Sequence, residues 1–211
     1  EPLSHGRVAI ATNAPPHVTV YNAQGNMEAV LGRQGDGPGE YSSVISVVGL
    51  GGDSVAVWDP TRRRVIVFTE IGEAARQIDL SSIVPIPVGA ATGTDVASGF
   101  TRALGTTGPN LILFGEGAVV PVSELTVTRP PMPARWIDPD GNVLATSTPI
   151  PGMDVFLGSP IGPIPRPFGA RAYAASQGER LAVGTAEETE YQVFDPDGNL
   201  GLIVRWPAVP R

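Results

Sequence analysis

The chain contains no cysteine, which excludes disulfide bonds, thiolate nucleophiles and cysteine metal ligands. Lysine is also missing, so all 14 positive charges are arginine, and we attribute this to a GC-rich genome that favours arginine codons. The net charge is −7. An acidic domain lacks the basic face that non-specific binding to nucleic-acid phosphates requires. We therefore expect no nucleic-acid partner.

Long apolar runs are absent as well. No stretch of the sequence approaches the roughly 20 apolar residues that a helix needs to cross a bilayer, so we expect no membrane span. The first residues, Glu1–Leu3, do not follow the basic-then-apolar order of a signal peptide. Such a peptide either never existed or has been removed.

Helical periodicity is weak throughout the sequence. No segment of about a dozen residues shows apolar spacing typical of a helix while staying free of glycine and proline. The best candidate, 70–78, is explained better as part of a hairpin. The 26 glycines and 22 prolines favour many short strands joined by tight turns, and 211 residues suit a single all-β domain.

A strand, a turn glycine and a second strand recur four times along the chain. The four segments begin at Val18, Val65, Arg135 and Tyr191, and their turn glycines are Gly25, Gly72, Gly141 and Gly198, spaced 47, 69 and 57 residues apart. Two turns read Asp-Pro-Asp-Gly, in which proline presets φ and glycine accepts a left-handed backbone. We expect hairpins with a type I turn followed by a left-handed residue.

Further apolar runs precede each hairpin and complete the repeating unit. The runs directly upstream are 7–12, 54–58, 110–114 and 180–184, and the runs before the last three of these are 44–48, 96–103 and 170–175. Four antiparallel strands per unit are typical of a β-propeller blade. We expect an all-β fold, a single β-propeller domain over residues 1–211 with about four blades.

The ends of this array look incomplete. Only Glu1–Gly6 precede the first run, so the first unit is expected to lack its innermost strand, and nothing resembling a further unit follows Trp206. Rings with more than four blades are more usual, which suggests that the chain is part of a longer ring. Two stretches rich in proline and glycine, 81–94 and 149–167, are interpreted as long surface connections without regular strand pairing.

The sequence G-R-Q-G-D-G-P-G-E-Y, Gly32–Tyr41, carries a family resemblance. It resembles the G-x-x-G-x-G-P-G-E motif, followed by an aromatic residue, that closes one blade in bacterial six-bladed β-propellers related to the NHL-repeat group. Residues 53–68 are similar to the strand pair after that motif, and residues 183–200 to a late blade. The resemblance covers 7–79 and 169–206, and implies a secreted or surface-associated, extracytoplasmic protein of mostly unassigned activity.

Two motifs could be mistaken for ligand sites. The turns starting at Asp138 and Asp195 place two carboxylates close together, but glycine stands fourth and no carboxylate twelfth, unlike an EF-hand calcium loop. The glycines of 32–39 are not followed by Lys-Ser/Thr or a helix, so a phosphate-binding loop is disfavoured. Within that stretch, Asp36 and Glu40 are expected to cap the glycine-rich turn.

Histidine and serine chemistry also find little support. His5 and His17 are the only histidines, twelve residues apart, and a metal site would need ligands from other blades, such as Asp53, Asp59 or Asp95. We interpret both as exposed or turn histidines. No G-x-S-x-G nucleophile motif occurs.

Two surface features leave alternatives open. Arg62–Arg64 form the densest positive cluster, interpreted as a solvated loop with ion pairs to Asp59 and Glu70, and alternatively as a docking patch for an acidic partner. The proline-rich stretch 149–167 is interpreted as a long loop, and alternatively as an extended recognition surface.

These observations favour a non-enzymatic propeller module that binds a protein, peptide or glycan on one face through its loops. The alternative is a propeller hydrolase or lyase with a divalent cation in the central funnel. Such an enzyme needs carboxylate, Asn or His side chains converging on the axis. The expected innermost strands, 44–48 and 170–175, offer one arginine and almost no metal ligands. We therefore assign no catalytic, cofactor-binding or metal-ligating residue and expect no cofactor.

Overall fold

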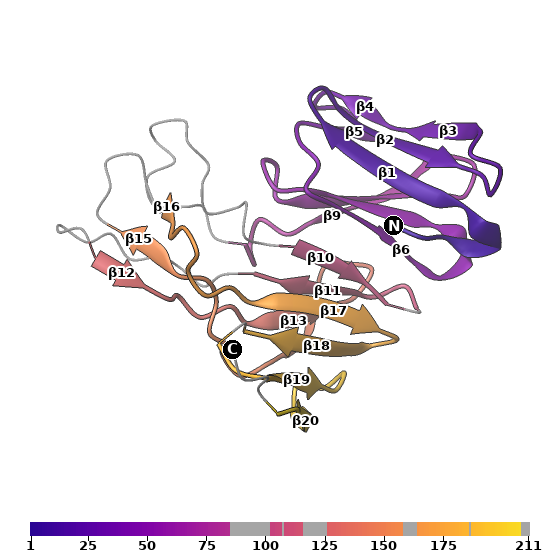
Figure 1. The fold of residues 1–211 in the computed structure, drawn as a ribbon. Helices are drawn as coiled ribbons and strands as arrows, with labels where there is room; N and C mark the ends of the chain where they lie inside the picture. The colour runs from indigo at the N-terminus through magenta and orange to yellow at the C-terminus, as the bar shows by residue number, and fades with distance from the viewer. Residues whose placement is uncertain (85–101, 107, 116–125, 158–163, 186, 208–211) are drawn as a thin grey trace.

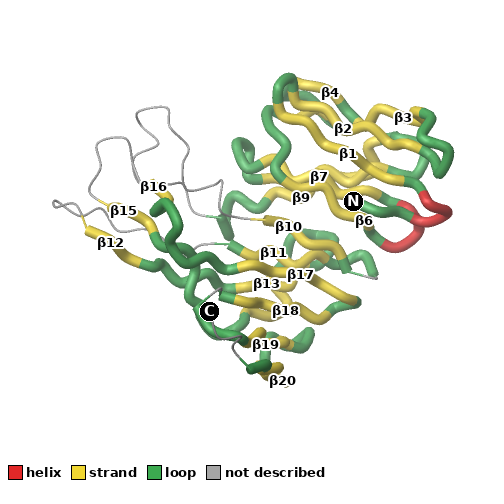
Figure 2. The backbone as a smooth tube through the Cα atoms, viewed as in Figure 1, coloured by secondary structure: helices red, strands yellow, loops and turns green. Residues whose placement is uncertain are grey.

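The structure is a computed structural model that describes residues 1–84, 102–106, 108–115, 126–157, 164–185 and 187–207. These residues form 20 strands and two short 3-10 turns, η1 (Ser4–Gly6) and η2 (Gly51–Asp53), which lie next to each other in Figure 2. Within this part of the chain, no helix has the length and apolar character needed to cross a membrane.

Most strands belong to four antiparallel sheets that follow one another along the chain. The first contains β1 (Val8–Asn13), β2 (Pro16–Tyr21) and β3 (Met27–Leu31). The second contains β6 (Ser46–Gly49), β7 (Val55–Asp59), β8 (Arg64–Phe68) and β9 (Ala74–Asp79). The third contains β10 (Arg102–Gly105), β11 (Leu111–Phe114), β13 (Ala134–Ile137) and β14 (Val143–Thr146). The fourth contains β17 (Tyr173–Gln177), β18 (Arg180–Gly184), β19 (Glu190–Phe194) and β20 (Leu200–Arg205).

The first strands of the sheets meet side by side at a common centre. Strand β6 contacts both β1 and β10, and β10 contacts β17, so the sheets fan out in chain order in Figure 1. Hydroxyl groups join neighbouring sheets there: Ser46 Oγ accepts a hydrogen bond from Ala103 N at 3.2 Å, and Ser176 Oγ donates one to Gly105 O at 2.6 Å. Four-stranded meanders arranged in this way around a centre are propeller blades, and the all-β propeller expectation is confirmed.

Apolar side chains fill the space between successive blades. Tyr41 and Phe68 lie between the first and second blades, Trp58 between the second and third, and Trp136 and Phe194 between the third and fourth. All five are at most 2% exposed. Because a blade inside the array is covered on both faces, β7 and β8 are buried at every position instead of alternating.

The four hairpin turns form as expected. Their glycines all have positive φ: Gly25 at 80°, Gly72 at 87°, Gly141 at 91° and Gly198 at 80°. Each glycine N–H donates to the carbonyl three residues before it, and a bulge follows where the strand pairing resumes. A type I turn with a left-handed glycine and a bulge is the geometry that the Asp-Pro-Asp-Gly sequences predict.

The expected innermost strands are found with shifted boundaries. The runs 44–48, 96–103 and 170–175 correspond to β6, β10 and β17, and residues 96–101 lie outside the described part of the chain. The first sheet has three strands, as expected, but Glu1–Leu3 also pair beside β1. Ala9 N donates to Glu1 O at 2.9 Å, and Pro2 bridges Val8. Glu1–Leu3 therefore lie where the innermost strand of this blade would pair with β1.

The expectation that 149–167 lacks regular pairing is wrong. Strands β15 (Val155–Leu157) and β16 (Ile164–Pro165) pair with β12 (Thr126–Thr128) in an additional sheet, seen at the left of Figure 1. The ladder continues to Pro131 and Pro151, which face each other while their neighbours make the hydrogen bonds, Met132 N to Ile150 O and Gly152 N to Pro130 O. Proline is tolerated there because this pair needs no N–H. Of the other stretch, 81–94, only Ser81–Val84 are described, as a turn.

Candidate functional site

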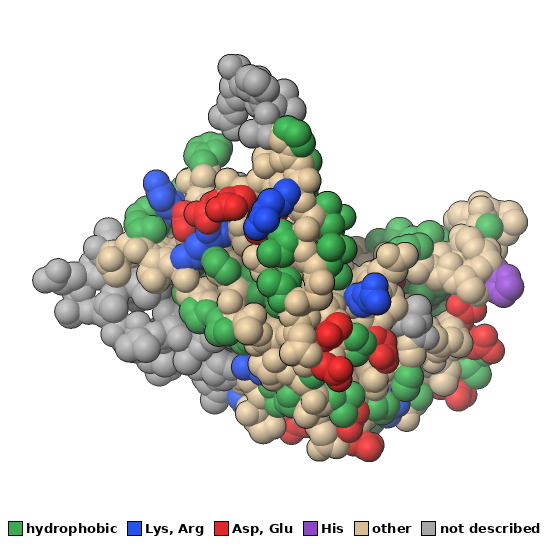
Figure 3. All heavy atoms as spheres, turned by 90° about the horizontal axis from the view of Figure 1, so that it is seen from below, with side chains coloured by type: hydrophobic (Ala, Val, Ile, Leu, Met, Phe, Trp, Pro, Cys, Tyr) green, Lys and Arg blue, Asp and Glu red, His purple; other side chains and the backbone are tan. Residues whose placement is uncertain are grey.

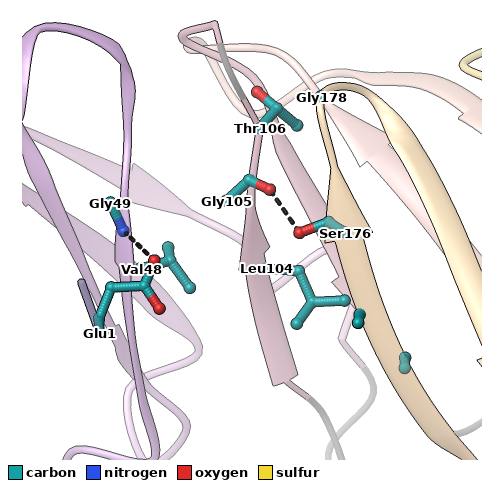
Figure 4. Close-up of a pocket in the computed structure, with 10 residues that line it drawn as sticks. Glu1, Val48, Gly49, Leu104, Gly105, Thr106, Ser176 and Gly178 are labelled. Carbon is teal, nitrogen blue, oxygen red and sulfur yellow. Dashed lines mark hydrogen bonds between the residues drawn. The ribbon is translucent and has the colours of Figure 1, made fainter. Parts of the chain in front are cut away.

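A cavity of about 410 Å³ lies at the centre of the blade array, where β6, β10 and β17 come together. Its walls are formed by Val48–Gly49, Leu104–Thr106 and Ala174–Ser176, with Glu1 and Gly178 at the edge (Figure 4). The innermost strands of a propeller converge on its axis without filling it, which leaves a hollow at the centre. The cavity is therefore our candidate binding site.

Small residues let the innermost strands approach closely around this cavity. A Cβ atom on Gly105 would lie 2.3 Å from the carbonyl oxygen of Gly49, so a larger residue there would push β10 away from β6. Ser176 Oγ is occupied by its hydrogen bond to Gly105 O, which fixes β17 against β10. The sequence therefore builds the cavity from residues whose lack of bulk is required by strand packing.

In the described part of the cavity wall, the polar side chains are two hydroxyl groups and one carboxylate. Glu1 is the one charged residue among the described residues that line the cavity, and its Oε1 accepts a hydrogen bond from Gly49 N at 3.1 Å (Figure 4). Thr106 Oγ1 donates to its own loop, to Asn110 O at 2.8 Å. Such a wall can hydrogen-bond a ligand, and its lining contains no nucleophile with a neighbouring base.

The Gly32–Tyr41 segment forms the junction between the first two blades. A short parallel pair, β4 (Arg33–Gln34) and β5 (Glu40–Tyr41), closes it. Tyr41, fully buried, donates from its hydroxyl to Leu31 O at 2.6 Å and accepts from Val18 N at 3.1 Å. Burial raises the pKa of the Tyr41 hydroxyl. A Cβ on Gly32 would lie 2.4 Å from Gly39 O, which explains the first glycine of the motif.

A carboxylate fills the concave side of this loop. Glu40 Oε2 accepts a hydrogen bond from Gly37 N at 2.8 Å, and Oε1 pairs with Arg33 Nε at 2.6 Å. The Gly37 hydrogen bond, followed by that from Arg33, lowers the pKa of Glu40. Glu40 therefore caps the turn and occupies the place where a phosphate would have to lie. Asp36 instead pairs with Arg62.

The three arginines 62–64 point to three different partners. Arg62 pairs with Asp36, while Arg63 donates to Ser81 O at 3.0 Å. Arg64 is buried and donates to Glu40 O at 2.7 Å, and its Nε lies 3.8 Å from Asp59 Oδ2. The expected local ion pair with Asp59 thus exists. However, these arginines are only partly solvated, because they bind groups around the blade junction.

Of the described candidate metal ligands, the structure brings only His5 in η1 and Asp53 in η2 near each other. His5 lies in η1 before β1, whereas His17 pairs with Thr12 at the far end of β1, where Thr12 Oγ1 lies 2.7 Å from its Nδ1. Asp53 accepts from Ser4, and Asp95 lies outside the described residues. Across the described ranges, no group of three or more His, Asp or Glu residues could hold a metal ion.

The aspartates of the hairpin turns use their oxygens locally. Asp138 Oδ1 accepts from Asp140 N at 2.9 Å and Asn142 N at 2.8 Å, and its Oδ2 accepts from Asn142 Nδ2 at 2.9 Å. The side-chain hydrogen bond from Asn142, followed by the one from its backbone N–H, lowers the pKa of Asp138. Asp195 makes the same contacts with Asp197 and Asn199. Both carboxylates therefore act as turn caps, as the sequence indicated.

Sequence reasoning did not find the cavity. The innermost strands were considered only as a source of metal ligands. The residues that indicate a cavity are the small ones in V-V-G at 47–49, A-L-G at 103–105 and A-A-S at 174–176. These positions become neighbours only when the blades are arranged around a centre. The spacing along the chain contains no such information.

No protein-family model and no curated protein matches this chain. Several solved structures share its fold. A Bacteroides fragilis protein assigned as exported superposes with a TM-score of 0.51 at 11% identity, over 92% of this chain and 67% of that one. The streptogramin B lyase structure superposes with a TM-score of 0.50 at 10% identity, over 99% of this chain and 54% of that one. At these identities the likeness shows the fold alone. This chain spans about half to two thirds of their lengths.

Proposed function

We propose that this propeller is a non-enzymatic binding module that holds a protein, peptide or glycan ligand on one face, with the central cavity as its deepest point. The observation that carries the proposal is the lining of that cavity. It combines small apolar side chains with the hydroxyl groups of Thr106 and Ser176 and the single Glu1 carboxylate. These groups suit hydrogen bonding to a neutral polar ligand.

We further propose that the chain belongs to a six-bladed, NHL-like ring. Support comes from the Gly32–Tyr41 junction and from the two outermost blades. Trp206 N donates to Thr189 O in the last blade just as Leu80 N donates to Arg63 O in the second, so Trp206 and Leu80 are equivalent. Leu80 is 1% exposed beneath the third blade, whereas Trp206 is 47% exposed. The last blade therefore presents a face that elsewhere in the molecule is covered by another blade.

The first blade presents a matching open face. Val8 and Ile10 occupy the positions that Val55 and Val57 hold in the second blade, yet they are 39% and 49% exposed while Val55 and Val57 are at most 2% exposed. Figure 3, which views the structure from below, the side on which the last blade lies, shows hydrophobic side chains exposed among charged ones there. Two open blade faces fit an incomplete ring.

An extracytoplasmic location is part of the proposal. It is supported by the resemblance to secreted or surface-associated propellers and by the structural likeness to a Bacteroides fragilis protein assigned as exported. The location can be checked by fractionating cells that produce the full-length polypeptide. Recovery in the cytoplasmic fraction would contradict it.

Binding can be tested by probing arrays of glycans and of peptides with the labelled 211-residue chain. Ala174→Phe, which fills the cavity, is expected to weaken the binding of a ligand held there by about tenfold or more. Because Ala174 also packs against the core between the third and fourth blades, circular dichroism must show that the variant is folded. Val143→Phe, at an exposed position of the outer strand β14, should leave the binding unchanged. Absence of specific binding, or equal binding by both variants, would contradict the proposal.

The alternative function, a hydrolase or lyase with a divalent cation in the funnel, makes a different prediction. Metal analysis of the purified protein would then find a tightly bound divalent ion in stoichiometric amount. Such a result would replace the binding-module proposal with the enzymatic one.

A further inference from the structure

The turn between β16 and β17, whose strands are labelled in Figure 1, carries a fully exposed aromatic ring on a strained backbone. Phe168 has a relative exposure of 108% and φ of +57°. A left-handed backbone is unfavourable for a residue with a Cβ atom, and a phenyl ring gains nothing from lying in water. Glycine at this position would satisfy the same turn. The phenylalanine is therefore not explained by the stability of this chain.

Hydrogen bonds to Asp154 fix both ends of this turn. Arg166 N donates to Asp154 O and Asp154 N to Ala170 O, both at 2.9 Å, so the two ends of the turn are fixed to one residue. The Asp154 side chain adds a second hold, since its Oδ2 accepts from Ala170 N at 3.1 Å and lies 3.5 Å from Arg166 Nη1. Gly169 N closes the turn by donating to Arg166 O at 3.0 Å.

Two prolines restrict the backbone on the approach to the ring. Pro165 ends β16 and Pro167 directly precedes Phe168, and proline fixes φ. A side chain presented by such a turn loses little conformational entropy when it is bound. Rigid aromatic anchors of this kind dominate the binding energy of protein interfaces.

The charge around the ring indicates the chemistry of the partner. Arg166, whose side chain is 52% exposed and pairs with Asp154, and the exposed Arg171 lie on either side of Phe168 in the chain, so the turn and Asp154 together carry a net charge of +1. The whole chain carries −7, so this turn differs in sign from the chain as a whole. A complementary surface has an apolar pocket bordered by carboxylates. One apolar side chain beside two arginines is too little for stable attachment to a membrane.

We propose that Phe168 is the anchor of a protein-docking surface formed by the 164–171 turn, and that the partner is a protein with an apolar pocket rimmed by Asp and Glu. This inference goes beyond the proposed binding function, because it assigns a second surface to the chain. The surface is separate from the central cavity, because none of its residues lines that cavity.

The first test measures whether the ring is free in the isolated chain. Hydroxyl-radical footprinting should modify Phe168 strongly and leave Phe194, which is 1% exposed, protected. Equal protection of the two rings would mean that Phe168 is covered by the protein itself. That result would overturn the proposal.

The second test selects binders to the 211-residue chain from a displayed library of small folded domains. Most independent binders are expected to carry carboxylates around an apolar pocket and to lose about tenfold or more affinity for Phe168→Gly. They should keep their affinity for Phe168→Trp and for Ile71→Ala, which changes another exposed apolar side chain in a turn. Binders indifferent to Phe168→Gly would overturn the proposal.

Controls separate this inference from misfolding, from membrane binding and from the central site. Phe168→Gly should unfold at the same temperature as the original chain or higher, since glycine relieves the left-handed strain. Cosedimentation with phosphatidylserine-containing vesicles that disappears in Phe168→Gly would replace a protein partner with a membrane. Array binding that is lost in Ala174→Phe and kept in Phe168→Gly, together with selected binders that are indifferent to Phe168→Gly, would leave the proposed function intact while this inference fails.

Discussion

At the scale of single residues, the blade junction depends on one buried carboxylate. Asp59 is 0% exposed and accepts hydrogen bonds from Ser42 N at 2.9 Å, Ser43 Oγ at 3.2 Å and Arg62 N at 3.3 Å, with the Arg64 guanidinium beside it. A buried charge is tolerated only when its partners are complete. Asp59 therefore joins the residues that follow the motif to β7 and β8, the second and third strands of the second blade.

Asp59→Ala should destabilise the protein by about 3–5 kcal/mol, because Arg64 and the loop donors would remain buried without their acceptor. Asp36→Ala removes the partner of Arg62 at a carboxylate that is 70% exposed, and should cost less than about 1 kcal/mol. Urea unfolding of both variants measures the difference. Similar midpoints for the two would refute the assigned role of Asp59.

Among the described residues, five carboxylates have a lowered pKa in the folded protein. Glu40 is held by Gly37 N and Arg33, and the others are Asp53, Asp79, Asp138 and Glu190. A lowered folded pKa means that the unfolded chain takes up protons first as the pH falls. The stability from these groups is complete above pH about 4.5 and is lost as the pH falls through their lower folded pKa values.

The melting temperature should therefore decrease below pH about 4.5, and Glu40→Gln should make that decrease shallower, because one titrating group has been removed. Thermal unfolding followed by circular dichroism at a series of pH values measures both slopes. Val143→Ala serves as a control that changes no charge. An unchanged slope in Glu40→Gln would contradict the capping role of the carboxylate.

At the scale of elements, each hairpin turn packs against the blade before it. A Cβ added to Gly72 would contact Leu31, one added to Gly141 would contact Ile78, and one added to Gly198 would lie 2.7 Å from Thr146 O. The first turn has no blade before it, and nothing lies within 4 Å of a Cβ at Gly25. The same turn thus performs two tasks, reversal of the chain and contact between blades.

These two tasks can be separated by alanine substitution. Gly25→Ala should cost about 1 kcal/mol, the price of a left-handed alanine. Gly198→Ala should cost about 1–3 kcal/mol more, because its methyl group would also overlap the backbone of β14. Chemical unfolding compares the two variants directly. Equal losses would show that the contact between blades does not constrain the turn.

The sequence predicted these elements unevenly, for physical reasons. Turn glycines and the strands around them are determined by local backbone chemistry, and β18 begins and ends where the pattern indicated, at 180–184. The pairing of β12 with β15 joins residues that are about thirty positions apart. Pro131 and Pro151 are accommodated in this pairing because they face each other at a position that needs no N–H. Local propensity cannot reveal such a register.

At the scale of the whole molecule, rotation of blades around a centre creates features that no single repeat contains. The central cavity combines the ends of three strands, and its closest approach, Gly49 against Gly105, joins two different blades. The repeat pattern predicted the blades and the junction motif. It could not predict the cavity, since small residues in a strand are individually unremarkable until the neighbouring strand is known.

The open ends of the array give the last prediction. Leu80→Asp places a charge in the cluster between the second and third blades and should destabilise the protein by about 4 kcal/mol or more, whereas the equivalent Trp206→Asp should cost less than about 1 kcal/mol in the 211-residue chain. Trp206→Asp should also reduce self-association, measured by sedimentation equilibrium, because it makes the open face of the last blade polar.

In a polypeptide with a complete six-bladed ring the same Trp206→Asp change should become as costly as Leu80→Asp, since a further blade would cover it. If Trp206→Asp remained harmless there, the face would be free in the native ring and the six-bladed proposal would fail.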